Sequence, residues 1–174
     1  MRDTPVLETP RLRLRAPVLT DFDAYAAMWA DDRVTAFIGG QLRTRNESWL
    51  RFIGIPGLWA LLGLGYWIFA DRDSDALIGV GGLAYFERGL PDLDGVPEAG
   101  WAIAPDHWSA GLVSEAMSAV MEWSDNVLKA PVVRCIINPG HGASEHVAGK
   151  LGFVQIGSGD LDQQPVNVYA RPRP

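Results

Sequence analysis

The segment from Ala104 to Ala116 constrains the fold more than any other part of this chain. An apolar stretch typical of a strand ends at Pro105, a turn rich in small residues follows, and a helical pattern begins near Ala110. The first turn of a helix has backbone N–H groups without intrahelical partners, and the helix dipole adds positive charge there. This order predicts a phosphate-binding site, although the same pattern also occurs as a plain strand-to-helix connection.

Hydrophobic periodicity predicts strands and helices along the rest of the chain. Residues 11–15 alternate with period two like a half-buried strand, and Thr20 is placed to cap a helix over 21–30. Further helices are predicted at 46–62, 110–129 and 144–151, and further strands at 65–71, 76–86, 98–104, 132–137, 153–158 and 165–171. No repeat or linker interrupts them. The predicted fold class is α/β, with a mixed α+β sheet in one domain over residues 1–174.

The composition excludes several classes of protein and partner. Apolar residues make up 48% and charged residues 21% of the chain, as in folded domains rather than disordered chains or coiled coils. The formal net charge of −6 disfavours nucleic acid as a partner, because phosphate binding needs a basic surface. The single cysteine, Cys135, fits a reducing, cytoplasmic location.

No segment predicts a membrane anchor. The N-terminus has no apolar run that could serve as a signal sequence. The stretch from Phe52 to Ala70 carries no charge, but glycines and a proline interrupt it and its second half resembles a strand. We therefore expect the end of a helix running into a core strand, and no membrane partner.

Several short motifs, taken in order, resemble the GNAT superfamily of acetyl-CoA-dependent N-acetyltransferases, and most closely its ribosomal-protein N-terminal (alanine) acetyltransferase branch. The motifs are LETPRLRLR at 7–15, LIG at 77–79, EAGW at 98–101, WSAGLVSEA at 108–116, AS at 143–144 and KLGF at 150–153. The resemblance covers nearly the whole chain. It implies the GNAT-like acyl-CoA N-acyltransferase fold, a central mixed sheet flanked by helices and splayed open between strands 98–104 and 132–137. Acetyl-CoA, the implied cofactor, would lie in the split.

The resemblance also implies which residues hold coenzyme A. The family's pyrophosphate loop matches residues 108–113, with Gly111 at its central position, where a missing Cβ lets the main chain approach the phosphates. The implied cofactor residues are Ala102, Ile103, Trp108, Ser109, Ala110, Gly111, Leu112, Val113, Ser114, His141 and Ser144.

Two of these positions depart from the family pattern. Val113 stands where the family has glycine or alanine, and His141 stands where it has asparagine. Both departures bear on the strength of coenzyme A binding, and His141 is either a cofactor contact or an ordinary loop histidine. Ser144 is expected to cap the following helix, with a cofactor contact as the second alternative.

Acetyl transfer to an amine needs a base that removes the amine proton and donors that hold the developing oxyanion. By resemblance, the donors are backbone N–H groups from Trp101 to Ile103. Glu98 is the candidate general base, directly or through a water, and the alternative is a solvated glutamate at a strand end. The family's usual tyrosine acid is absent, because Ala148 and Gly149 stand at its position.

The acceptor implied by the resemblance is a primary amine, either a protein N-terminus or a small cationic amine. Acidic residues on loops that flank the family's acceptor cleft favour a cationic amine, or else form a solvated acidic surface: Asp92, Asp94, Glu98, Asp160 and Asp162. A non-catalytic acyl-CoA-binding or sensor module with the same fold is the alternative function. The oligomeric state is open, with a homodimer among the alternatives.

Other arrangements of reactive residues favour ordinary structural roles. Cys135 lies in an apolar strand without a histidine at a diagnostic spacing, so we expect a buried thiol rather than a nucleophile. We expect no metal site, because the spacing of the histidines, Cys135 and Glu145 matches no zinc motif. Arg11, Arg13 and Arg15 share one strand face, which is either solvated or bound to an anionic partner such as ribosomal RNA.

Overall fold

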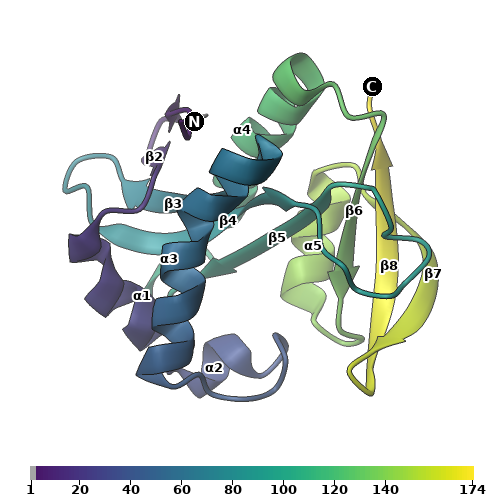
Figure 1. Ribbon diagram of the computed structural model, residues 1–174, viewed down its shortest axis with the longest axis horizontal. Coiled ribbons are helices and arrows are strands. Elements are labelled where there is room, and N and C mark those ends of the chain that lie inside the picture. The colour runs from purple at the N-terminus through teal and green to yellow at the C-terminus, as the bar shows by residue number, and fades with distance from the viewer. Residues whose placement is uncertain (1–2) are drawn as a thin grey trace.

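An eight-stranded sheet forms the centre of the computed structural model, which describes residues 3–174 (Figure 1). The strand order is β1-β2-β3-β4-β5-β6-β8-β7, and every neighbouring pair is antiparallel except β5 and β6. The strands are β1 (Leu7–Glu8), β2 (Leu12–Arg15), β3 (Tyr66–Asp71), β4 (Leu77–Ala84), β5 (Glu98–Ile103), β6 (Val132–Ile137), β7 (Val154–Leu161) and β8 (Gln164–Pro172). The predicted mixed sheet is confirmed.

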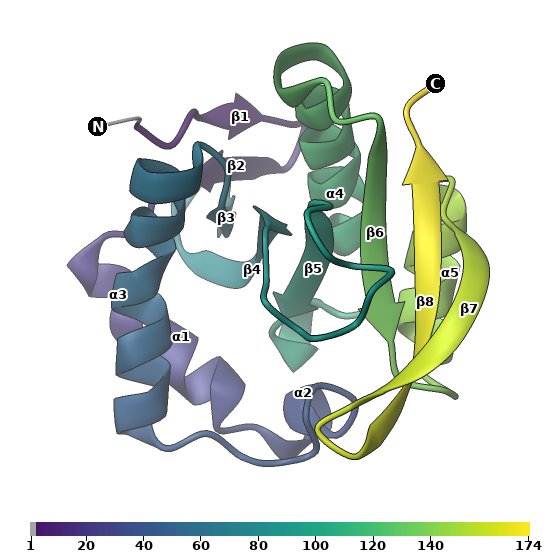
Figure 2. The same ribbon diagram turned by 45° about the vertical axis from the view of Figure 1, so that its right-hand side comes forward.

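Helices cover both faces of this sheet (Figure 2). They are α1 (Phe22–Trp29), α2 (Asp32–Thr35), α3 (Arg45–Leu62), α4 (Leu112–Trp123) and α5 (Gly142–Lys150), with 3-10 turns η1 (Leu19–Asp21) and η2 (Pro105–His107) and a π-helical turn η3 (Ser124–Leu128). One buried cluster joins α1 and α3 to the sheet, and a second joins α4 and α5 to its other face. Within residues 3–174, no helix combines the length and apolar character needed to cross a membrane.

The sheet opens between its two parallel strands. β5 and β6 share one register pair, Glu98 with Arg134, and the Arg134 N–H donates to the carbonyl of Pro97 at 2.9 Å. β5 pairs with β4 along its whole length, from Glu98 to Ile103. Beyond Glu98, the edge of β5 that faces β6 therefore has backbone groups without a strand partner. This is the splayed sheet that the resemblance implies.

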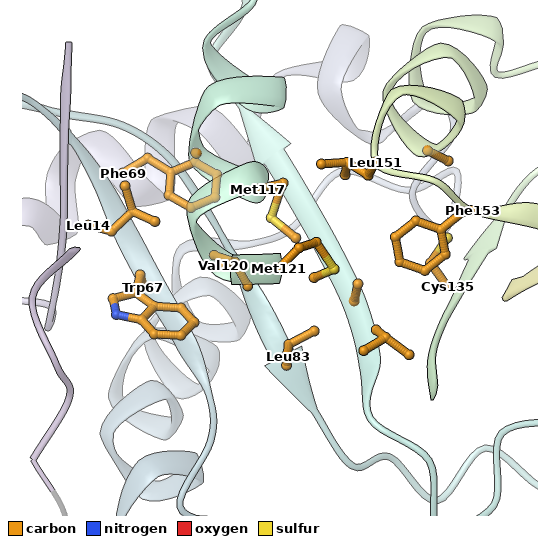
Figure 3. Close-up of a cluster of buried hydrophobic side chains, with 14 of the residues drawn as sticks. Leu14, Trp67, Phe69, Leu83, Met117, Val120, Met121, Cys135, Leu151 and Phe153 are labelled. Carbon is orange, nitrogen blue, oxygen red and sulfur yellow. The ribbon is translucent and has the colours of Figure 1, made fainter. Parts of the chain in front are cut away.

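Side chains of α4 fill the space between the two halves of the sheet (Figure 3). Met117 and Val120 are fully buried against the strands, and apolar residues of both sheet halves and of the segment after α5 complete the cluster: Leu14, Trp67, Phe69, Leu83, Cys135, Leu151 and Phe153. Burial raises the pKa of the Cys135 thiol, so the thiolate is disfavoured. Cys135 therefore packs as a small apolar side chain, as expected.

The predicted elements differ from the structure mainly at helix ends. Thr20 does not cap α1, because the chain enters that helix through the 3-10 turn η1 and no side chain makes the cap hydrogen bond. The helix predicted at 110–129 begins at Leu112 and ends as α-helix at Trp123. The charge-free stretch is the end of α3 followed by β3, as expected.

Carboxylates engage the three arginines at β2. Arg11 pairs with Glu115 of α4 at 2.7 Å, and Arg13 pairs with Glu8 at 2.8 Å. Arg15 makes two hydrogen bonds to Asp21, which is buried. The face of β2 is therefore occupied by internal ion pairs rather than being a free basic surface.

Candidate active site

A pocket of about 760 Å³ lies at the open end of the split sheet. Its walls are the end of β5, the turn before α4, the first turns of α4 and α5, and the segment that contains α2. We call it the α4–α5 pocket. Its lining includes Trp101 and ten of the eleven predicted cofactor residues: Ala102, Ile103, Trp108, Ser109, Gly111, Leu112, Val113, Ser114, His141 and Ser144. Two predicted site residues, Ala110 and Glu98, are not part of the lining.

The turn that leads into α4 has an unusual backbone. Ser109 and Gly111 both have positive φ, 59° and 74°, and Gly111 is the N-cap of α4. The Trp108 indole N–H donates to the carbonyl of Ile103 at 2.9 Å, and the Arg11 guanidinium donates to the carbonyl of Ala110 at 2.9 Å. These bonds hold the turn so that Gly111 and the residues after it face the pocket. Ala110 instead is tied to Arg11, outside the lining.

The segment around α2 forms a wall that the sequence patterns do not reveal. Arg33, Val34, Ala36, Phe37 and Ile38 line the pocket opposite α4 and α5. α2 has only four residues, which is too short to show a hydrophobic period. The one local signal is Asp31, whose side chain accepts from the Arg33 N–H and caps the helix.

Phe37 and His141 connect this wall to α5. Their rings stack with centroids 4.5 Å apart and an angle of 8° between the planes. Burial lowers the pKa of His141, against a smaller opposite effect of Glu145. The neutral imidazole is therefore the favoured form in this stack at neutral pH.

The start of α5 corrects one expectation. Ser144 lies inside α5, which begins at Gly142, and His141 occupies the N-cap position without a side-chain cap hydrogen bond. Glycine and alanine after His141 are compatible with the first helical turn, so the helix begins earlier than the serine signal predicts. Ser144 is therefore part of the pocket wall, not the cap.

Comparisons with known proteins agree with this geometry. A family model for the acetyltransferase (GNAT) domain matches residues 11–154. The uncharacterized N-acetyltransferase YoaA of Bacillus subtilis (strain 168) is 30% identical over 158 residues, which cover 88% of this chain and 85% of that protein. This chain belongs to the GNAT acetyltransferase family. Its acetyl donor is therefore acetyl-CoA.

Solved structures share the fold of this GNAT acetyltransferase. A protein from Bordetella pertussis, described as a GNAT-family acetyltransferase, matches with a TM-score of 0.84 at 30% identity over 97% of this chain and 99% of that chain. A spermidine N-acetyltransferase from Vibrio cholerae, solved with CoA and spermine, has a TM-score of 0.74 at 16% identity over 95% of this chain and 97% of that chain. The second likeness shows the fold alone.

The α4–α5 pocket of this acetyltransferase has the chemistry that coenzyme A requires. Unpaired N–H groups at the start of α4 suit a pyrophosphate, and Gly111 leaves open space where a Cβ would meet only Arg11 at 3.8 Å. Lys150 and His146 of α5 and Arg33 of α2 add cationic or polar groups to the rim. In residues 3–174, no group of three or more His, Cys, Asp and Glu side chains is placed to hold a metal ion.

Val113 has two roles in the GNAT acetyltransferase. It lines the α4–α5 pocket and also packs against the core cluster on the α4 face. The branched side chain is thus partly accommodated by the core. Sequence alone places it at the loop but not against the core.

Glu98 lies on β5 in a different environment from the one expected for a strand end. Its side chain is 4% exposed, and its two carboxylate oxygens accept from Nε and Nη2 of Arg88 at 2.9 and 2.7 Å. Arg88 in turn lies over the ring of Phe86, 4.4 Å from its centroid. Glu98 is therefore a buried, ion-paired carboxylate and not a solvated one.

A tyrosine stands near Glu98 although none occupies the family's usual acid position. The Tyr66 hydroxyl lies so close to Gly100 of β5 that a Cβ at this position would clash with it. Burial, and then the charge of Glu98, raises the pKa of Tyr66. Tyr66 is therefore held as a neutral phenol beside the split strand. No sequence pattern reveals it, because the contact joins β3 to β5.

Proposed function

We propose that this acetyltransferase moves the acetyl group of acetyl-CoA directly to a primary amine within a ternary complex. The observation that carries the proposal is the split strand β5. Its unpaired edge from Trp101 to Ile103 faces the α4–α5 pocket, which has the α4 N-terminus as another wall. A carbonyl placed at this edge and a pyrophosphate placed at α4 would both meet backbone N–H donors.

The backbone supplies the binding groups in this proposal. Acetyl-CoA, when bound, supplies an activated thioester. The N–H groups of Leu112, Val113 and Ser114 bind its pyrophosphate, and Ser109 and Gly111 shape the turn that lets the chain approach. The N–H groups of Trp101 and Ile103, which alternate with the β4-facing N–H of Ala102, hold the thioester oxygen as its negative charge grows.

Glu98 is the proposed general base. It precedes the thioester-facing part of β5 and accepts the proton of the incoming ammonium, directly or through a water. Because its carboxylate is bound to Arg88, taking up that proton requires the ion pair to loosen. The thiolate leaving group needs little acid assistance, so the missing tyrosine at 148–149 does not prevent the reaction.

Direct transfer is favoured over an acetyl-enzyme. Cys135 is 1% exposed in the core, and burial raises the pKa of its thiol. A buried neutral thiol is a poor nucleophile. The amine nitrogen therefore attacks the thioester without a covalent enzyme adduct.

The acceptor proposed from the sequence is a protein N-terminus, as in the ribosomal-protein branch, or a small cationic amine. The case for a cationic amine depended on acidic loop residues and on Glu98. In the structure, the charge of Glu98 is neutralised by Arg88. The charges nearest to the proposed base therefore give no support to a polycationic acceptor.

A transfer assay tests the proposed function. The protein is incubated with acetyl-CoA and a panel of primary amines, while thiol release and acetylated products are followed by absorbance and mass spectrometry. We expect an acetylated amine in equal amount to the released thiol, and no acetylated protein when the amine is omitted. If no amine in the panel is acetylated and acetyl-CoA does not bind, the proposal is wrong.

A further inference from the structure

The side chain of Tyr66 reaches from β3 across β4 to the split strand β5. These three strands lie next to one another in the sheet (Figure 2), and Tyr66, Gly82 and Gly100 form one row across them. A Cβ at Gly82 would be 2.7 Å from the Tyr66 Cα, and a Cβ at Gly100 would clash with the Tyr66 hydroxyl. Two glycines in this row therefore leave the room in which the phenol places its hydroxyl on β5.

The Tyr66 hydroxyl lies between the proposed base and the α4–α5 pocket. Glu98, Gly100 and Ala102 are alternate residues of β5, so they share one face of the strand, each about 6.6 Å from the next. Ala102 lines the α4–α5 pocket and belongs to the buried cluster of α1 and α3, against which Tyr66 also packs. The hydroxyl at Gly100 is therefore one step along this face from Glu98 and one step from the pocket.

The same hydroxyl lies near the backbone group proposed to hold the thioester. Trp101 follows Gly100, and its N–H is on the edge of β5 that has no strand partner beyond Glu98. A Cβ at Gly100 and the Trp101 nitrogen are each within two bonds of the Gly100 Cα, so the hydroxyl is within about 6 Å of that N–H. An amine that attacks a carbonyl held there from the α1 and α3 side passes the Tyr66 hydroxyl.

The Tyr66 hydroxyl has no hydrogen-bond partner in the protein. Within residues 3–174, the hydrogen bond that joins Tyr66 to a side chain uses its backbone carbonyl, which accepts from the Trp59 indole N–H at 3.0 Å. In the same part of the chain, its phenol oxygen neither donates nor accepts, although the residue is half-buried. A half-buried hydroxyl without a partner is available to a ligand.

The protonation state of Tyr66 limits what its hydroxyl can do. Burial and the charge of Glu98 raise the pKa of Tyr66, with a small further rise from Tyr25, while Arg88 and Arg51 oppose these effects. The phenolate is therefore disfavoured near neutral pH, so Tyr66 is not a base on its own. A phenol is also a weaker acid than a thiol, so it does not protonate the coenzyme A thiolate. A neutral phenol can still accept one proton while it donates another.

Glu98 is set back from the space that an acceptor would occupy. Its side chain is 4% exposed, it is not part of the pocket lining, and both of its oxygens accept from Arg88. A base in this position needs a group that connects it to the amine. The Tyr66 hydroxyl lies at the position on β5 where such a group is needed.

We propose that the Tyr66 hydroxyl is a catalytic residue that passes a proton from the acceptor amine to Glu98. The inference rests on the proposed acetyl transfer, and it assigns a residue to the step between amine and base. Tyr66 lies on β3, away from the position 148–149 at which the family's tyrosine acid is missing. It acts on the amine and not on the leaving group.

Atoms and protons balance in the proposed step. One N–H bond of the acceptor ammonium breaks as its proton moves to the phenol oxygen, the phenol O–H bond breaks, and a new O–H bond forms on Glu98. Tyr66 is therefore neutral before and after. The neutral nitrogen attacks the thioester carbon, the C–N bond forms, and the C–S bond breaks to release the thiolate. A second proton of the nitrogen passes to the thiolate, and Glu98 returns its proton to solvent.

Tyr66→Phe tests this inference, with Tyr25→Phe as the matched control. Tyr25 is a buried tyrosine of the same cluster and lies on α1. Single-turnover rates of acetyl transfer are measured at saturating acetyl-CoA with alanine, alaninamide and spermidine as acceptors. We expect Tyr66→Phe to lower the rate about tenfold or more and Tyr25→Phe to lower it less than about twofold. Equal losses in both variants, or no loss in Tyr66→Phe, overturn the inference.

Two further readouts distinguish a proton relay from a structural role. Because the hydroxyl has no partner, Tyr66→Phe should have the same free energy of unfolding in urea as the unchanged protein. The loss of rate should shrink as the pH rises through the pKa of the acceptor amine, about 8 for alaninamide and about 10 for spermidine, since a neutral amine needs no relay. A loss of rate that is independent of pH, or that comes with an equal loss of stability, contradicts the relay.

Gly100→Ala tests the same hydroxyl from the opposite strand. The added Cβ displaces the hydroxyl from β5, so we expect a slower transfer in the unchanged background. In Tyr66→Phe the displaced group is already absent, so Gly100→Ala should lower the rate much less there. Losses that simply multiply in the double variant would show that the two positions act independently and would overturn the inference.

The outcomes separate this inference from the proposed function. Transfer at the full rate by Tyr66→Phe overturns the relay and leaves the acetyl transfer intact. If none of the three amines is acetylated and acetyl-CoA does not bind, both are wrong. Slower transfer in Tyr66→Phe, with unchanged acetyl-CoA affinity by calorimetry and a loss that shrinks with rising pH, supports the inference.

Discussion

The two sides of β5 offer different chemical groups to a ligand. On the α4–α5 side, backbone groups dominate, and the turn through Gly111 exposes the N–H groups at the start of α4. On the α1 and α3 side, charged and aromatic side chains dominate, with Glu98 and Arg88 next to Tyr66. A backbone site tolerates changes of side chain, whereas a side-chain site changes its ligand with each substitution. The proposed cofactor side should therefore tolerate substitutions of side chains, whereas substitutions on the proposed acceptor side should change which amine binds.

Removing the base should have the largest effect and should leave the cofactor side intact. We expect Glu98→Gln to reduce kcat about 100-fold, the usual scale of a general base. The glutamine side chain has the same shape and its oxygen still accepts one hydrogen bond from Arg88, but Arg88 loses its counter-charge, so the melting temperature of the variant is measured alongside. Thiol-release assays measure the loss of kcat, and calorimetry measures whether acetyl-CoA still binds. Unchanged turnover between pH 6 and 9 would show that Glu98 is not the base.

Straining the turn at Gly111 should weaken acetyl-CoA binding and leave the proposed base in place. Gly111 has φ of 74°, and a β-branched residue in this region is unfavourable by about 1–2 kcal/mol. We expect Gly111→Val to weaken acetyl-CoA binding about tenfold or more by calorimetry. Gly54→Val, at an open position of α3 with ordinary φ, is the control and should bind normally. Equal affinities in both variants would contradict the role of this turn.

Substitution of Val113 tests whether its side chain stabilises the core as well as lining the α4–α5 pocket. Because it packs against the core as well as the pocket, we expect Val113→Ala to lower the free energy of unfolding by about 1 kcal/mol. Urea unfolding measures this loss, and Ser118→Ala, at an exposed position of α4, is the control. No measurable loss would show that the side chain serves only the pocket.

Replacing His141 in the Phe37–His141 stack should have the smallest effect on stability and on acetyl-CoA affinity. The effect on stability should depend on pH. Burial depresses the pKa of His141 in the folded protein, so its share of stability is complete above the unfolded value of about 6.5 and is lost as the pH falls below it. Melting temperatures at pH 7.5 and 5.5 should therefore differ less in His141→Asn than in the unchanged protein. We expect acetyl-CoA affinity at pH 7.5 to change about twofold. An identical pH dependence in both proteins would contradict the role of His141.

The residues that line the α4–α5 pocket were easier to predict from the sequence than the surroundings of Glu98, for a physical reason. The turn and first helical turn of α4 are local, so adjacent residues carry their signal. The sequence also singles out Glu98 but not its partner Arg88, because the pair forms across an irregular loop. Phe37 and His141 come together from distant parts of the chain, and Tyr66 reaches β5 across the sheet. Such contacts depend on how distant segments pack, so no spacing of residues in the sequence reveals them.

Thermal unfolding with acetyl-CoA tests the central claim most directly. At a hundred times its dissociation constant, a ligand adds about 2.7 kcal/mol, which for a chain of this size corresponds to roughly 5–10 °C. We predict a rise of this size for the unchanged protein and for Gly54→Val, and a much smaller rise for Gly111→Val. No rise in the unchanged protein, or an equal rise in Gly111→Val, would contradict the assignment of acetyl-CoA to the α4–α5 pocket.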